Sequence, residues 1–139
     1  MDFSRARAHL ESGGYTLVLD DGNALLTSKA RGVAPLLAFL EEGNDLSAFR
    51  AVDKVVGKAA AFLYILLGVR AVFAIIVSEE ALSLMRKNGI LVEYETCVPR
   101  IRNREGTGFC PMESAVLSEI DPHSALEKII KTRDALSGK

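Results

Sequence analysis

The pattern of apolar and polar positions predicts a helix and a hairpin in the first part of the chain. Residues Asp2–Glu11 predict a short helix that ends at Gly13, where the backbone can reverse without steric cost. Two apolar runs, Tyr15–Asp20 and Asn23–Ser28, flank an Asp-Gly step. Because such a step favours the positive φ angles of a tight turn, we predict that the two runs pair as an antiparallel hairpin.

The middle of the chain is its most apolar part. Val33–Glu42 has apolar side chains at helical spacing, and Val52–Leu67 is apolar almost all round. The second pattern is typical of a helix that several neighbours cover, so we expect a central helix packed across a sheet. Ala71–Val77 is a continuous apolar run of strand length, which indicates a strand buried on both faces, and Ile90–Glu95 predicts the next strand.

The segment between these two strands has clear helix signals. Ser78 is a favourable N-cap residue, two glutamates follow in the first turn, two basic residues lie in the last turn, and Gly89 follows them. A strand, a helix and a strand in succession predict that Ala71–Val77 and Ile90–Glu95 pair in parallel through a right-handed crossover.

The last third predicts an edge strand over Val98–Asn103 and two helices, one beginning at Pro111 and one running from Asp121 to Leu136. The apolar stripe of the last helix packs either on the core or on a second subunit, so a homodimer is left open. The expected fold class is α/β: a three-layer α/β/α sandwich with a mixed sheet, in which an N-terminal antiparallel hairpin is followed by parallel strands.

Composition narrows the class of protein. A chain of 139 residues fits a single domain, 1–139. With 49% hydrophobic residues and a net charge of -1, the protein has no large electrostatic field of either sign, so we expect no nucleic-acid partner.

The most apolar segment, Val55–Val69, is shorter than the roughly 20 residues of a membrane span. We find no export signal and therefore expect a cytoplasmic protein, with free thiols at Cys97 and Cys110.

Four segments resemble a known family. They are VDKVVGKAAAFL (Val52–Leu63), AVFAIIVSEEAL (Ala71–Leu82), NGILVEYE (Asn88–Glu95) and IRNREGTGFCPMES (Ile101–Ser114). Over nearly the whole chain, the sequence resembles the uncharacterised prokaryotic domain-of-unknown-function family 1893. The order of elements is similar to that of the cytidine deaminase-like fold, and the resemblance implies this fold. It implies no activity, because none is established for the family.

The zinc chemistry of deaminases is not predicted. Deaminases of this fold hold zinc with a His or Cys near a glutamate on the buried helix, and with two cysteines that open the following helix. Here the first set of positions reads Gly57, Lys58 and Ala59, and the following helix opens without cysteine. His9 and His123 lie near the two chain ends. We therefore predict no metal site, no cofactor and no zinc-dependent deamination.

The first candidate site is the start of the predicted central helix, where Asp53, Lys54 and Lys58 interrupt an apolar surface. On a helix, Lys54 and Lys58 share a face. One interpretation is structural: Asp53 caps the helix, and the lysines extend along apolar surface to reach water. The other is that Gly57 lets a ligand approach the backbone while Lys58 supplies a cation.

The second candidate site is the segment Asn103–Glu113. Cys110 precedes a helix amino end, where a thiolate would be stabilised, and Glu113 has the spacing of a capping box with it. That interpretation is structural. Alternatively, Asn103 and Arg104 stand beside a glycine-rich loop that suits a phosphate or carboxylate, and Cys110 acts as a nucleophile with Glu113 or Lys58 as its base.

These residues leave three functional hypotheses. The first is a protein that binds a small molecule, such as a nucleotide or a related metabolite, between Asp53–Lys58 and Asn103–Glu113; the ligand class rests on analogy of fold. The second is an enzyme in which Cys110 is a nucleophile or sulfur carrier. The third is a structural or interaction subunit that has no ligand. The first is preferred.

Overall fold

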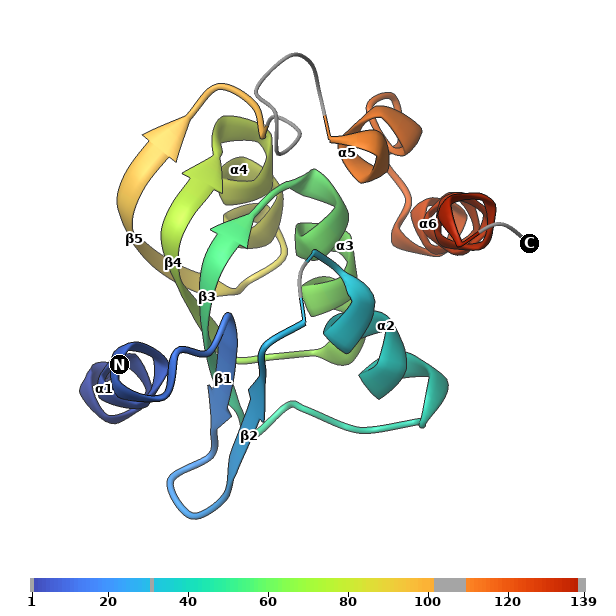
Figure 1. Cartoon of the computed structure of the whole chain (residues 1–139). Helices are drawn as coiled ribbons and strands as arrows, with labels where there is room; N and C mark the ends of the chain where they lie inside the picture. The colour runs from blue at the N-terminus through green and yellow to red at the C-terminus, as the bar shows by residue number, and fades with distance from the viewer. Residues whose placement is uncertain (1, 31, 102–109, 138–139) are drawn as a thin grey trace.

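A five-stranded mixed sheet forms the middle of the molecule (Figure 1). The computed structural model describes residues 2–30, 32–101 and 110–137. The strands are β1 (Leu17–Asp20), β2 (Leu25–Ser28), β3 (Arg50–Val56), β4 (Ala71–Ser78) and β5 (Leu91–Val98). Their order in the sheet is β2-β1-β3-β4-β5. β1 pairs antiparallel with both β2 and β3, whereas β3, β4 and β5 run parallel to one another.

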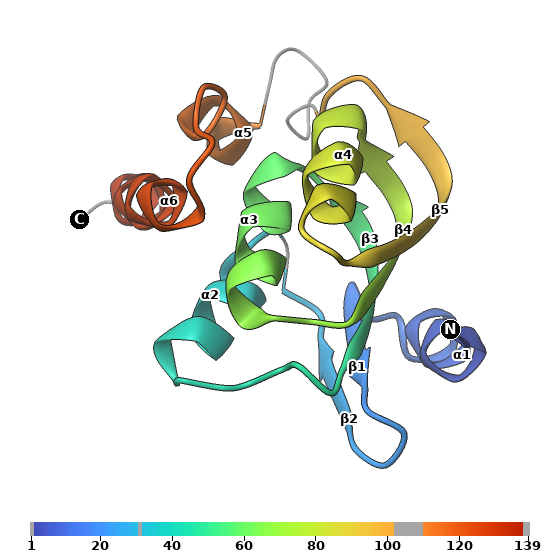
Figure 2. The same ribbon diagram turned by 180° about the vertical axis from the view of Figure 1, so that it is seen from behind.

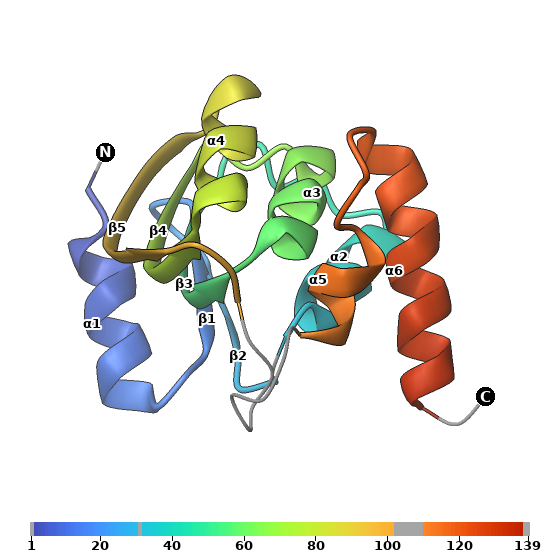
Figure 3. The ribbon, with the colours of Figure 1, turned by 90° about the horizontal axis from the view of Figure 1, so that it is seen from above.

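Helices cover both faces of this sheet (Figure 2). The helices are α1 (Ser4–Gly13), α2 (Ala34–Glu41), α3 (Lys58–Leu67), α4 (Glu79–Lys87), α5 (Pro111–Ala115) and α6 (Pro122–Leu136). α1 lies on one face, and α2, α3 and α4 lie on the other, with α5 and α6 packed outside α3 (Figure 3). The predicted α/β class, with a mixed sheet and helices on both sides, is confirmed.

The predicted hairpin is confirmed as β1 and β2, which pair from Leu17 with Ser28 to Asp20 with Leu25. In the connection, the Asp21 carboxylate accepts hydrogen bonds from the backbone amides of Asn23 and Ala24, and Gly22 adopts a φ of 100°. The aspartate thus satisfies backbone donors that the turn leaves without strand partners, and the glycine takes up the positive φ.

The predicted central helix over Val52–Leu67 is wrong in its first part. Residues Arg50–Val56 form β3, which lies between β1 and β4, and the helix α3 begins only at Lys58. Gly57 between them has extended backbone angles, with φ -100° and ψ -174°. The physical reason is that β3 contains three valines, whose β-branched side chains favour a strand. The antiparallel hairpin is therefore joined to the parallel strands through an additional central strand.

The edge strand predicted over Val98–Asn103 is also wrong for its described residues. β5 itself extends to Val98 and forms the edge of the sheet, and the chain bends at Pro99 and Arg100. Proline has no amide hydrogen to donate, so the strand pairing stops there. Residues 102 and 103 lie outside the described residues.

Two apolar clusters hold the layers together. The larger lies between the sheet and α2, α3 and α4, and its largest fully buried side chains include Phe62 and Tyr64 of α3. The smaller lies under α1 and contains Phe3, Val52 and Phe73. Each large apolar side chain that leaves water contributes about 1.5–3 kcal/mol. Because seven residues of α3 are buried, its position relative to the sheet is firmly set.

The apolar stripe of α6 packs on this core. Ala125 and Ile129 are fully buried, and Leu126 and Ile130 pack against the same cluster, while Leu136 is exposed. Of the two predicted roles of the stripe, contact with the core is thus present in the fold, and the homodimer stays a prediction. Among the described helices, none has the length and apolar character needed to cross a membrane.

Candidate functional site

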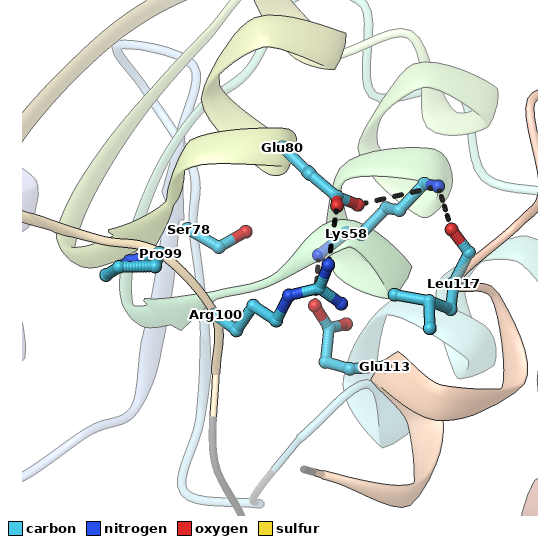
Figure 4. Close-up of a pocket in the computed structure, with 7 residues that line it drawn as sticks. All are labelled: Lys58, Ser78, Glu80, Pro99, Arg100, Glu113 and Leu117. Carbon is cyan, nitrogen blue, oxygen red and sulfur yellow. Dashed lines mark hydrogen bonds and ion pairs between the residues drawn. The ribbon is translucent and has the colours of Figure 1, made fainter.

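A small pocket lies where the parallel strands end and the helices α3 and α4 begin (Figure 4). The residues that line it are Lys58, Ser78, Glu80, Pro99, Arg100, Glu113 and Leu117. They come from α3, from the junction of β4 with α4, from the bend after β5, and from α5 with its following turn. In open α/β sheets, ligands bind at the carboxyl ends of the parallel strands, so the pocket has the position expected of a ligand site.

The Glu113 carboxylate binds the amino end of α3. Its two oxygens accept hydrogen bonds from the backbone amides of Lys58 at 2.6 Å and Ala59 at 2.8 Å. The first amides of a helix have no partner within the helix and carry its positive partial charge, which makes them good donors to an anion. Gly57 makes room for this contact, since a Cβ atom at that position would lie 2.5 Å from the Glu113 carboxyl carbon.

The Lys58 side chain links three parts of the pocket. Its Nζ donates a hydrogen bond to the Leu117 carbonyl oxygen at 2.8 Å and forms an ion pair with Glu80 at 3.6 Å. Glu80 also pairs with the Arg100 guanidinium at 3.7 Å. The Lys58 side chain is only 14% exposed, so its charge acts through less water than a surface lysine's would. Two cations and two carboxylates therefore meet in this pocket (Figure 4).

Burial raises the pKa of the Glu113 carboxyl above its ordinary value, because ionisation is costly away from water. The two amide hydrogen bonds and Lys58 oppose this effect, whereas the Glu80 carboxylate adds to it. Glu113 is therefore closer to its neutral form at a given pH than an exposed glutamate would be.

Ser78 completes the floor of the pocket. It is buried, and its hydroxyl accepts a hydrogen bond from the Ala81 amide at 3.2 Å, which caps α4 as the sequence predicts. The free space at the centre of the pocket is about 10 Å³. That volume is on the order of what one water molecule requires. In this conformation the pocket is thus too small to enclose a metabolite.

The predicted first site is only partly assembled. Lys58 lines the pocket and Gly57 adjoins it, but Asp53 and Lys54 lie on β3 rather than on a helix. Lys54 is exposed, and its predicted helical face shared with Lys58 is wrong. Asp53 instead accepts a hydrogen bond from the Tyr64 hydroxyl at 2.6 Å, on the side of the sheet that α3 covers. These two residues do not line the pocket.

The Asp53–Tyr64 pair has its own electrostatic character. Burial raises the pKa of the Asp53 carboxyl to about 7, although the hydrogen bond from Tyr64 favours its ionised form. Burial and the neighbouring carboxylate also raise the pKa of the Tyr64 phenol. Since Tyr64 is fully buried, this hydrogen bond satisfies a hydroxyl that would otherwise lack a partner in the core.

Of the predicted second site, the structure describes Cys110 and Glu113. Asn103 and Arg104 lie outside the described residues. Glu113 and Lys58 do meet in space, but the capping box predicted for Glu113 is wrong, because its carboxylate binds α3 rather than its own helix. Cys110 is the N-cap residue of α5, and its side chain makes no capping hydrogen bond. It does not line the pocket.

Sequence reasoning missed five lining residues, of which three are polar: Ser78, Glu80 and Arg100. A signal for these three polar residues was available in the sequence, because Ser78 is the last residue of β4, and Glu80 and Arg100 follow the ends of β4 and β5 closely. Once β4 and β5 are predicted to be parallel, residues just after both strands are expected at one edge of the sheet. Among the described residues, no group of three His, Cys, Asp or Glu side chains is placed to hold a metal ion.

Comparisons with known proteins agree on one relationship. Residues 5–132 match the sequence model of the family described as TM1506, domain of unknown function (DUF1893). A crystal structure of a DUF1893 family protein from Thermotoga maritima, TM1506, is similar with a TM-score of 0.87 and 26% sequence identity. The alignment covers 93% of this chain and 88% of that chain. Among curated proteins, none matches.

Proposed function

The chain belongs to the DUF1893 family, and from its pocket we propose that it binds a small metabolite, of nucleotide-like type, between the amino ends of α3 and α4. The observation that carries the proposal is the meeting of Lys58 and Arg100 with the amino ends of two helices in one pocket. Side-chain cations and helix amides together suit an anionic group.

The surroundings support a ligand that is partly polar. Ser78 offers a hydroxyl at the floor, and Pro99 and Leu117 offer apolar surface at the sides. A few polar groups converging in a partly apolar pocket are typical of small-molecule sites. The nucleotide-like class rests on analogy with a cytidine deaminase-like scaffold that lacks the zinc motif, which we propose as the type of this fold.

The other proposals carry less structural support. An enzyme that uses Cys110 as nucleophile needs a base near the thiol, and Cys110 lies outside the pocket lining. We keep the cytoplasm as the proposed location and a homodimer as a proposed assembly. A purely structural subunit is the outcome to which a failed ligand search points.

The test is a thermal-shift screen of the purified protein against nucleotides, nucleobases and sugar phosphates. A ligand that binds only the folded chain raises the melting temperature by mass action. We expect at least one compound to stabilise the wild-type protein, and neither Lys58→Met nor Arg100→Gln to respond to it. Methionine keeps the apolar stem of Lys58 while removing the charge, so it limits the loss of packing.

The matched control is Lys131→Met, which removes an exposed lysine of α6. It should respond to the compound as the wild-type protein does. A compound that stabilises Lys58→Met as strongly as the wild type would place binding elsewhere. A screen without any hit would remove the main support for a metabolite-binding role.

A further inference from the structure

The pocket holds an internal anion at the point where a ligand's anionic group would bind. Glu113 already accepts hydrogen bonds from the amides of Lys58 and Ala59, at 2.6 and 2.8 Å. A phosphate or carboxylate at this end of α3 would need the same two donors. The two anions therefore exclude each other.

We propose that the ligand carries an oxyanion, such as a phosphate or carboxylate group, and that this group displaces the Glu113 carboxylate from the amino end of α3. Glu113 then competes with the ligand and keeps the pocket closed while no ligand is bound. This inference rests on the proposed function, since it concerns how the same pocket takes its ligand.

The space around Gly57 supports the exchange. The pocket has room for roughly one water molecule, so a lining group must move before the pocket can enclose the anionic group of a metabolite. Gly57 leaves a hollow that the Glu113 carboxylate fills, because a Cβ atom at that position would overlap the carboxylate. When the Glu113 side chain swings away, this hollow, with its two amide donors, becomes free for another oxyanion.

The packing of α5 allows the Glu113 side chain to rotate. None of the five residues of α5 is fully buried, and the apolar contact of α5 with the core is made by Met112 rather than by Glu113. The turn that follows is held more firmly, by the buried side chain of Val116 and by the hydrogen bond from Lys58 to the Leu117 carbonyl. A rotation of the Glu113 side chain therefore leaves the main core contacts intact.

The charges facing Glu113 favour replacement of one anion by another. Lys58 faces it from α3, Arg100 from the bend after β5, and Glu80 from α4 (Figure 4). The two cations and the Glu80 carboxylate remain when Glu113 leaves, so an incoming oxyanion meets one more positive than negative side chain. Burial also raises the pKa of the Glu113 carboxyl, and a protonated Glu113 competes less well. Oxyanion binding should therefore tighten as the pH falls.

The test uses inorganic sulfate, which keeps its charge over the working pH range. Wild-type protein labelled with ¹⁵N, Glu113→Gln and Glu127→Gln are titrated with sulfate at constant ionic strength, and the amide resonances of Lys58 and Ala59 are followed. Glu127 is exposed on α6, so Glu127→Gln controls for the loss of one negative charge.

We expect Glu113→Gln to bind sulfate about tenfold more tightly than the wild type, because the competing state is weakened. Glu127→Gln should match the wild type, and the difference between wild type and Glu113→Gln should narrow as the pH falls. Equal sulfate affinity in Glu113→Gln and wild type, or unmoved amide resonances, would overturn the inference. If Glu113→Gln does not fold, the wild-type pH profile decides, since a sulfate affinity that does not tighten at lower pH contradicts competition by Glu113.

The two proposals fail in different ways. If Glu113→Gln binds sulfate more tightly but no metabolite stabilises any variant, the competitor role stands and the metabolite-binding proposal fails. If a metabolite stabilises the wild type and Glu113→Gln to the same degree at every concentration, metabolite binding stands and the competition is wrong.

Discussion

Gly57 and Glu113 fit each other closely, although they are far apart in the sequence. The backbone of Gly57 is extended and requires no positive φ, so other residues can adopt it. What Gly57 provides is the absence of a side chain where the Glu113 carboxylate approaches α3. The interaction joins the last part of the chain to the helix that the core holds most firmly.

Substitution Gly57→Ala should destabilise the protein by about 1–3 kcal/mol, because the new methyl group overlaps the Glu113 carboxylate and forces it away. Urea unfolding measures the change. The control is the same substitution in a Glu113→Ala background, where the overlap is gone and the cost should nearly vanish. An equal loss in both backgrounds would mean that Gly57 matters for another reason.

Asp53 should make stability depend on pH. Its carboxyl has a pKa of about 7 in the folded chain, against an ordinary value of 3.8. The folded chain therefore holds this proton more tightly, so the associated stability is fully present below pH 3.8 and is lost as the pH rises through 7. Asp53→Asn should be more stable than the wild type at pH 8 and gain little at low pH.

Urea unfolding of the wild type and Asp53→Asn at several pH values tests this prediction. Asparagine keeps an oxygen that can accept the Tyr64 hydrogen bond, so the two proteins differ mainly in charge. Asp45→Asn is the control, because hydrogen bonds from Ser47 lower the pKa of this exposed carboxyl. It should gain no stability at pH 8. A pH profile of Asp53→Asn parallel to that of the wild type would contradict the raised pKa.

Two of the described helices, α4 and α6, have clear capping signals at their amino ends. Ser78 caps α4, and Asp121 caps α6 by accepting a hydrogen bond from the Ser124 amide at 2.9 Å. The carboxylates and basic residues of α4 lie at the ends where they complement the helix dipole. Such local signals explain why these two helices can be predicted accurately from sequence.

Ser78→Ala should cost about 1 kcal/mol, because the Ala81 amide loses its partner at a buried helix end. Ser83→Ala is the matched control on the same helix; Ser83 is exposed, and alanine is favoured inside a helix. Unfolding in urea should therefore separate the two variants. Equal stability of both would show that the cap contributes nothing measurable.

The boundary between β3 and α3 marks where prediction from sequence fails. The hairpin, β4, α4, β5 and α6 follow from local patterns, but Val52–Val56 and the start of α3 belong to one largely apolar stretch that only a few polar residues interrupt. The valines favour a strand in the first half, and pairing with β1 and β4 on both sides, which the sequence does not show, fixes it. The contact of Glu113 with α3 is equally non-local, and its spacing to Cys110 favours a local cap that does not form.

At the scale of the whole molecule, the sheet brings the site together. β3, β4 and β5 run parallel, so their carboxyl ends lie side by side. α3, α4 and the bend after β5 all start at these ends. α5 then covers these strand ends, and its Glu113 carboxylate is hydrogen-bonded to the amino end of α3. Residues from four separate segments thus form one pocket, whose free volume in this conformation is small.

The measurement that tests this account most directly is amide chemical-shift mapping of ¹⁵N-labelled protein with nucleoside 5′-monophosphates, added one at a time. We expect one or more of them to move the resonances of Lys58, Ala59, Glu80 and Arg100 with a common saturation curve, while those of α1 and the β1–β2 hairpin stay unchanged. Shifts that gather away from the amino ends of α3 and α4, or no saturable shift with any of these compounds, would contradict it.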